Sequence, residues 1–169
     1  MNYILLCICC FFTSFSYAYV VLPYTWNSST LDIQFCETAS PIIQNMTKSI
    51  INDMNALDFF YIELKEQSTN SICNHHFTNG YGLTRYLIEN NIIQYAKIYI
   101  SNELLENVNV LYNVLLHELL HFVGLDHSTE VGMMNYSVRL DRYGTSTLYD
   151  HKWYMSIDDY LGIQSIYSN

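Results

Sequence analysis

Positive charge is scarce in this chain, which has seven Lys and Arg against 16 Asp and Glu and a formal net charge of -9. Nucleic-acid binding and attraction to anionic membranes both rest on clustered cations, so we expect neither kind of partner. Proline and glycine are also few, with two and six residues, and no repeat or proline-rich linker divides the chain. A length of 169 residues, half of them apolar, therefore predicts one folded domain rather than a disordered protein.

The sequence also lacks an apolar run long enough to cross a bilayer comfortably. The run from Tyr3 to Phe12 is short, and Ser16-Tyr17-Ala18 offers small residues where a signal peptidase would cut. This pattern predicts a signal peptide at 1–18, a mature domain at 19–169, secretion, and no membrane attachment after the leader is removed. No Lys or Arg precedes the apolar run, so an uncleaved anchor or a buried strand is the alternative.

Cysteine is present in only five copies, and three of these lie in the predicted leader. Cys36 and Cys73 remain. In an oxidising compartment they would form one disulfide, and the alternative is two buried thiols. Glycosylation sequons begin at Asn27, Asn45 and Asn135, which gives weak support to secretion as a glycoprotein.

Hydrophobic periodicity predicts a mixed α/β or α+β domain. Apolar residues alternate at 31–35, 60–64 and 96–100, as in half-buried strands. Ser40 and Pro41 predict the start of an amphipathic helix of about five turns, whose apolar residues run from Ile42 to Leu57. Residues 66–94 allow no clear assignment, although Asn79-Gly80 and Gly82 favour turns.

Two further helices are predicted in the second half of the chain. Asn109 is the expected cap of one helix, which would run to about Val123 and stop at Gly124. Residues 125–155 show no regular pattern. Ser156 and Asp159 have the spacing of a capping box and predict a last helix that ends near Tyr167.

The segment His117–His127, which reads HELLHFVGLDH, carries the chemistry. His117 and His121 are four residues apart and share one face of a helix, so both rings can reach one metal ion. Gly124 can break the helix because glycine adopts positive φ without strain, and the chain can then return His127 to the same ion. Three imidazoles that leave one position open are typical of catalytic zinc, whereas structural zinc usually has four protein ligands. We therefore expect one catalytic Zn²⁺.

Glu118 is the expected general base. Zinc lowers the pKa of a bound water toward about 7, and Glu118 would accept the proton of that water and pass it to the leaving amine. Chance occurrence of three histidines, a glutamate and a glycine at these spacings is rare. A helix with ordinary core histidines is the alternative that this pattern must exclude.

At these residues the sequence resembles a matrixin, the matrix metalloproteinase family of the metzincin clan. Ser128 follows the third histidine as in matrixins. Gly132-Met133-Met134-Asn135-Tyr136 resembles the Met-turn, and residues 156–167 are similar to the family's last helix. The resemblance implies a metzincin-like α+β fold: a twisted mixed sheet of four to five strands, three helices, and an active-site helix followed by the Met-turn. It further implies that Met134 lies beneath the zinc ligands and that Asp158 and Asp159 brace this turn.

The chain also departs from the family pattern. We find no propeptide, cysteine-switch motif or hemopexin-like domain, so the resemblance is to a minimal form. Only His75 and His76 precede the active-site helix where the family's structural zinc ligands would lie, so no structural zinc is predicted. The sequence neither predicts nor excludes bound calcium, since the Gly- and Asp-rich calcium-binding loops of the family are missing. Tyr136 resembles the tyrosine of astacins and serralysins and is a candidate auxiliary ligand. Asp158 could pair with the amine of Tyr19 after signal removal.

The sequence thus predicts a secreted zinc endopeptidase that acts as a monomer on extracellular proteins or peptides bound in extended form. The loop at 137–155 is expected to line the cleft. Two alternatives are a metzincin of the astacin or serralysin type, and a zinc-binding decoy that does not cut. Ser128 and the last helix argue against the first, and an intact Glu118 argues against the second.

Overall fold

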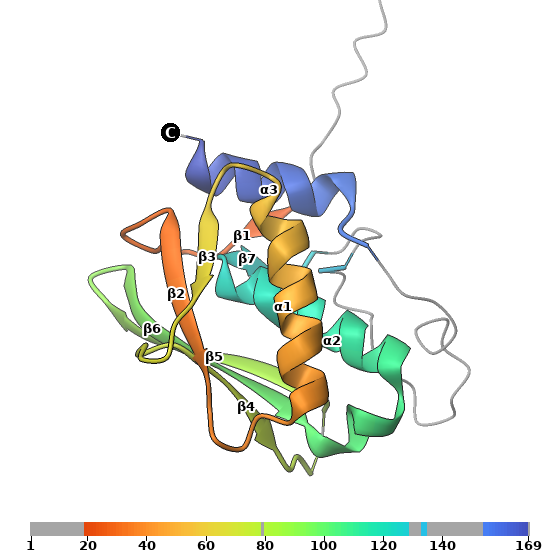
Figure 1. Cartoon of the computed structure of the whole chain (residues 1–169). Helices are drawn as coiled ribbons and strands as arrows, with labels where there is room; N and C mark the ends of the chain where they lie inside the picture. Colours follow the sequence, from red (N-terminus) through yellow and green to blue (C-terminus); the bar gives the residue numbers. More distant parts are fainter. Residues whose placement is uncertain (1–18, 79, 129–132, 135–153, 169) are drawn as a thin grey trace, which may run out of the picture.

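The computed structural model describes residues 19–78, 80–128, 133–134 and 154–168 (Figure 1). It contains three α-helices, a five-stranded mixed sheet and a two-stranded antiparallel sheet, so the predicted α+β class is confirmed. The elements follow in the order β1 (Val20–Val21), β2 (Thr30–Phe35), α1 (Pro41–Asn55), β3 (Tyr61–Leu64), β4 (Ser71–His75), β5 (Gly82–Glu89), β6 (Ile92–Ser101), η1 (Asn102–Glu106), α2 (Val108–Phe122), β7 (Leu125–Asp126) and α3 (Ile157–Tyr167).

The five-stranded sheet has the order β3-β2-β4-β6-β5. Strands β3, β2, β4 and β6 are parallel, and β5 pairs antiparallel with β6 at one edge. Asn90 and Asn91 join β5 to β6 with φ of 52° and 61°. Two left-handed residues match the right-handed twist of a hairpin, and asparagine tolerates this conformation well. This hairpin and β4 occupy much of the segment 66–94, which the periodicity left unassigned. Gly82 lies in β5 and not in a turn.

One apolar core joins the sheet to the helices. Helices α1 and α2 lie beside the sheet and α3 crosses one end of it (Figure 1). The inward residues Ile33, Ile72 and Ile98 come from β2, β4 and β6, and all three are fully buried. They pack in the same cluster as the apolar faces of α1 and α2. One face of the sheet is therefore buried beneath two helices, of which α1 is the crossover between the parallel strands β2 and β3.

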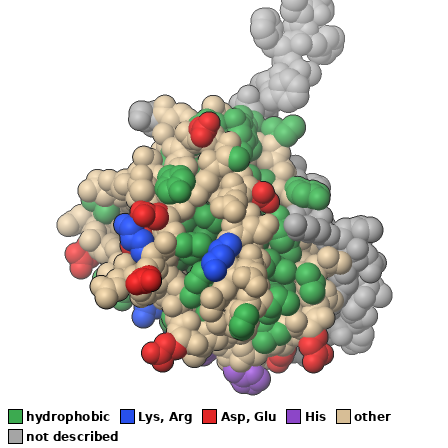
Figure 2. All heavy atoms as spheres, in the orientation of Figure 1, with side chains coloured by type: hydrophobic (Ala, Val, Ile, Leu, Met, Phe, Trp, Pro, Cys, Tyr) green, Lys and Arg blue, Asp and Glu red, His purple; other side chains and the backbone are tan. Residues whose placement is uncertain are grey.

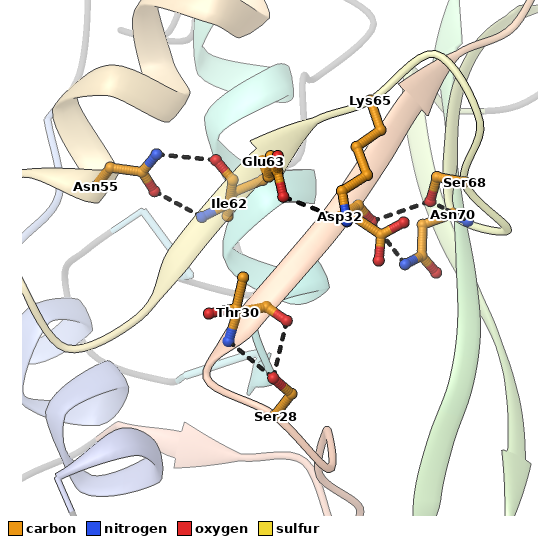
Figure 3. Close-up of polar contacts among 9 residues, drawn as sticks. All are labelled: Ser28, Thr30, Asp32, Asn55, Ile62, Glu63, Lys65, Ser68 and Asn70. Atoms are coloured by element: carbon orange, nitrogen blue, oxygen red, sulfur yellow. Dashed lines mark hydrogen bonds and ion pairs between the residues drawn. The ribbon is translucent and has the colours of Figure 1, made fainter.

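Polar side chains fix the strands at places where the backbone ladder is incomplete (Figure 3). The Asn55 side chain at the end of α1 accepts from the Ile62 N–H at 2.7 Å and donates to the Ile62 carbonyl at 2.9 Å. Asn70 donates to the carbonyl of Asp32 at 2.7 Å and accepts from the N–H of Ala96 at 2.8 Å. These amides join α1 to β3 and β2 to β6. They satisfy backbone groups that would otherwise be costly to bury.

Capping explains where each helix begins. Ser40 accepts from the Ile43 N–H, and Pro41 takes the first turn, as predicted. Ser156 and Asp159 form the predicted capping box, and α3 ends at Tyr167. The predicted cap of α2 at Asn109 was wrong. Asn107 is the cap, because its side chain accepts from the Val110 N–H at 3.2 Å after the short turn η1.

Cys36 and Cys73 form a disulfide between the end of β2 and β4, so the structure has the bonded form of the two alternatives. On the face shown in Figure 2, the few basic side chains lie singly among acidic ones. Within the described ranges, no helix combines the length and apolar character that a membrane span requires. The predicted leader at 1–18 and the sequon at Asn135 lie outside the described residues.

Candidate metal centre

Three histidine rings converge at the end of α2. The Nε2 atom of His127 lies 3.2 Å from Nε2 of His117 and 3.3 Å from Nε2 of His121. One ring nitrogen from each residue can be chosen so that all lie within 4.8 Å of one another. The predicted ligand set is thus brought together at one point.

In two of the histidines, the Nδ1 atom is hydrogen-bonded to a backbone carbonyl. Nδ1 of His117 lies 2.8 Å from the carbonyl of Met133, and Nδ1 of His121 lies 2.8 Å from the carbonyl of Leu125. A carbonyl can only accept, so each Nδ1 carries the proton and each Nε2 presents a lone pair to the shared point. The carbonyls therefore fix both the tautomer and the orientation that metal binding requires.

Burial also favours the neutral form of the His117 and His121 rings. Burial lowers the pKa of His117, and burial together with the neighbouring His117 lowers the pKa of His121 to about 3. A neutral imidazole is the form that binds a metal, so little competition from protons is expected at neutral pH.

Zinc fits this donor set. Ligand nitrogens about 2.1 Å from a tetrahedral zinc ion lie about 3.4 Å apart, close to the two separations between Nε2 atoms. Two lone pairs aimed at one point repel each other unless a cation lies between them. The three histidines could therefore hold a metal ion, and three imidazoles are a donor set that zinc accepts.

The third ligand is placed by a turn and a small sheet. Helix α2 ends at Phe122, and Gly124 follows with φ of 111°, so the predicted helix break is confirmed. Strand β7 then pairs with β1 near the start of the described residues, Val20 opposite Asp126 and Val21 opposite Leu125. The Asp126 side chain also accepts from the N–H of His127 at 2.7 Å. These contacts direct the chain back toward the two helical histidines.

The end of α2 is held by two aromatic side chains. Trp26 donates from Nε1 to the Phe122 carbonyl at 2.6 Å, and the Tyr167 hydroxyl donates to the Val123 carbonyl at 2.8 Å. These bonds satisfy backbone acceptors that have no partner within the helix. The helix end next to Gly124 is thus fixed by segments from both ends of the described chain.

Glu118 lies beside the first ligand and is 5% exposed. The hydroxyl of Thr84 on β5 lies 2.7 Å from its Oε2. Burial raises the pKa of Glu118 to about 7, and hydrogen bonds from Thr84 oppose this rise. A carboxyl with this pKa can both accept and release a proton near neutral pH.

Asp159 connects the last helix to the turn after the ligands. Its Oδ2 accepts from the N–H of Met133 at 3.1 Å, and from the N–H and hydroxyl of Ser156, both at 2.8 Å. The carbonyl of the same Met133 holds the ring of His117, so Asp159 braces the centre through one intervening residue. Met134 is buried, and its carbonyl accepts from the Ser128 N–H at 2.7 Å.

The structure does not test the roles predicted for several other residues. Tyr136 and residues 137–153 lie outside the described residues. Asp158 is half-buried beside the capping box, and its pairing with the amine of Tyr19 stays a prediction. The sequence analysis missed Thr84. Only the alternation of Gly82, Thr84 and Tyr86 indicates which side chains of β5 could face the helix.

No protein-family model matches this chain, and no curated protein matches it significantly. The α+β fold and the three convergent histidines are therefore the findings from which function is argued.

Proposed function

We propose that the chain is a secreted zinc endopeptidase of the metzincin type, with residues 19–169 as its catalytic domain. The observation that carries the proposal is a buried carboxylate, Glu118, next to three histidines that present their Nε2 atoms to one point. The fold is consistent with the metzincin arrangement, and the motif segments around the centre resemble matrixins. The disulfide between Cys36 and Cys73 supports an oxidising, extracellular location.

Each residue of the centre has a defined part in the proposed hydrolysis. His117, His121 and His127 would hold zinc. When bound, zinc would polarise the substrate carbonyl and make water a stronger nucleophile near neutral pH. Glu118 would take the proton from the attacking water and return it to the nitrogen of the leaving amine. Its pKa of about 7 suits both transfers, because neither protonation state is then strongly favoured.

The sheet offers a place for an extended substrate. Among the described residues, strand β5 pairs with β6 alone and is therefore an edge strand of this sheet. Thr84 in this strand contacts Glu118, so the edge runs past the proposed catalytic group. A peptide that adds to such an edge uses the backbone N–H and C=O groups that have no ladder partner. This geometry supports protein or peptide chains as the substrate class.

The test is hydrolysis of a broad fluorogenic peptide library by the purified mature protein. We expect activity that a zinc chelator abolishes and that added zinc restores. Glu118→Gln should bind one zinc per chain as the wild type does, yet hydrolyse about a hundred- to ten-thousandfold more slowly, as expected when a general base is lost. Activity that survives this substitution would refute the role of Glu118. Zinc binding without hydrolysis by the wild type would instead favour the decoy.

A further inference from the structure

Three residues of β5 face the helices in a regular alternation. Gly82, Thr84 and Tyr86 pair with Ile100, Ile98 and Ala96 of β6, and these three partners are fully buried. Cross-strand partners share a face of the sheet, so this set faces the core and α2. The register is regular from Gly82 to Leu87 and shifts only after Leu87. The side chain of Thr84 is therefore directed at α2 by the strand itself.

Thr84 contacts Glu118 at two atoms. Its Oγ1 lies 2.7 Å from Oε2 of the carboxylate and 3.1 Å from the Glu118 carbonyl oxygen. A hydroxyl has one proton to donate, and the carboxylate is both the nearer and the charged acceptor. The stronger bond thus fixes one carboxylate oxygen.

Gly82 supplies the space that this arrangement needs. A Cβ at position 82 would lie 2.6 Å from Oε1 and 2.8 Å from Cγ of Glu118, and 2.7 Å from the side chain of Val114. Side-chain carbons do not approach so closely, so only glycine allows β5 to pack against this part of α2. Thr84 holds one oxygen of the carboxylate, and the missing side chain at position 82 accommodates the other.

We propose that Thr84 is a positioning residue that holds the Glu118 carboxylate in the orientation for proton transfer, with Gly82 providing the room for it. The inference rests on the proposed function, because it gives Glu118 the role of general base. A group that acts only on the base should affect kcat and leave KM and zinc content unchanged. Loss of a residue that orients a catalytic group typically costs about ten- to a hundredfold in activity.

The experiment compares Thr84→Val with Thr84→Ser in the zinc-loaded mature protein. Valine keeps the branched shape and removes the hydroxyl, whereas serine keeps the hydroxyl and removes the methyl group. We expect Thr84→Val to lower kcat about ten- to a hundredfold at unchanged KM and zinc content, and Thr84→Ser to retain most activity. Gly82→Ala should also lower kcat while zinc remains bound. In a Glu118→Gln background, Thr84→Val should have little further effect, because the two residues act as one unit.

Several outcomes would overturn the inference. Equal kcat for wild type and Thr84→Val would refute it, and so would equal losses in the valine and serine variants, since these would indicate packing alone. A fall in zinc content in Thr84→Val would show that Thr84 supports metal binding instead of the orientation of Glu118, and would also refute the inference. If the wild type binds zinc without hydrolysing peptides, the proposed function fails. Crystal structures of the zinc-loaded proteins then test the contact, because an unmoved Glu118 carboxylate in Thr84→Val would show that Thr84 does not position it.

Discussion

Replacing Glu118 by glutamine is expected to stabilise the metal-free protein, and increasingly so as pH rises. The carboxyl is 5% exposed, and burial raises its pKa from the usual 4.5 to about 7. Between these values the folded protein binds a proton that the unfolded chain has lost, so this carboxyl costs stability as pH rises from 4.5 through 7. Glutamine has no such proton, and its amide oxygen can still accept from Thr84. The histidine titrations are common to both proteins.

The magnitude follows from the two pKa values. Full ionisation of Glu118 in the buried site lowers the unfolding free energy by about 3 kcal/mol. About 2 kcal/mol of this loss develops between pH 5.5 and pH 8. We therefore expect the gap in unfolding free energy between Glu118→Gln and wild type to widen by about 2 kcal/mol over that interval. Urea unfolding followed by tryptophan fluorescence, with a chelator present, measures this gap. A gap that stays constant or narrows with rising pH would refute the electrostatic description of Glu118.

The other predictions concern the ligands, the brace, the packing of α3 and the disulfide. His127→Ala should weaken zinc binding by at least about a hundredfold in a chelator competition, and an unchanged affinity would exclude His127 as a ligand. Asp159→Ala leaves three donors without their acceptor and should cost about 2–4 kcal/mol of unfolding free energy in urea. Gly162→Ala places a Cβ 2.7 Å from Leu125 and should lower stability by about 1–3 kcal/mol, whereas a neutral result would mean that α3 can shift. Reduction of the disulfide, which closes a loop with a sequence separation of 37, should cost about 4 kcal/mol, and should cost nothing in a control variant that carries serine at positions 36 and 73.

The parts of the site that the sequence predicted are those set by local rules. Helical spacing places His117 and His121 on one face, Gly124 needs the positive φ that it has, and Ser156 with Asp159 forms its capping box within one turn. Each of these depends on residues at most a few positions apart. Periodicity and capping preferences are therefore sufficient to find them.

The parts that sequence reasoning missed depend on contacts between distant segments. Thr84 and Glu118 are 34 residues apart, and they meet only because β5 turns back on β6 and packs against α2. Strand β4 has serine, asparagine and histidine among its five residues, so it lacks the apolar alternation that identifies a strand. Asn107 and Asn109 are both good caps by residue type, and the sequence pattern did not distinguish them. Asn107 is the cap because the 3-10 turn η1 ends at Glu106, directly before it.

The pairing of β1 with β7 links the first described residues to the residue just before His127. Tyr19 also lies against α3, close enough that a Cβ at Gly162 would be 3.1 Å from it. For anyone preparing this protein, a purification tag fused at residue 19 would lie next to the strand that supports His127. Tags added after Asn169 avoid the strand that carries that support, so the position of a tag becomes an experimental variable in any study of the candidate metal site.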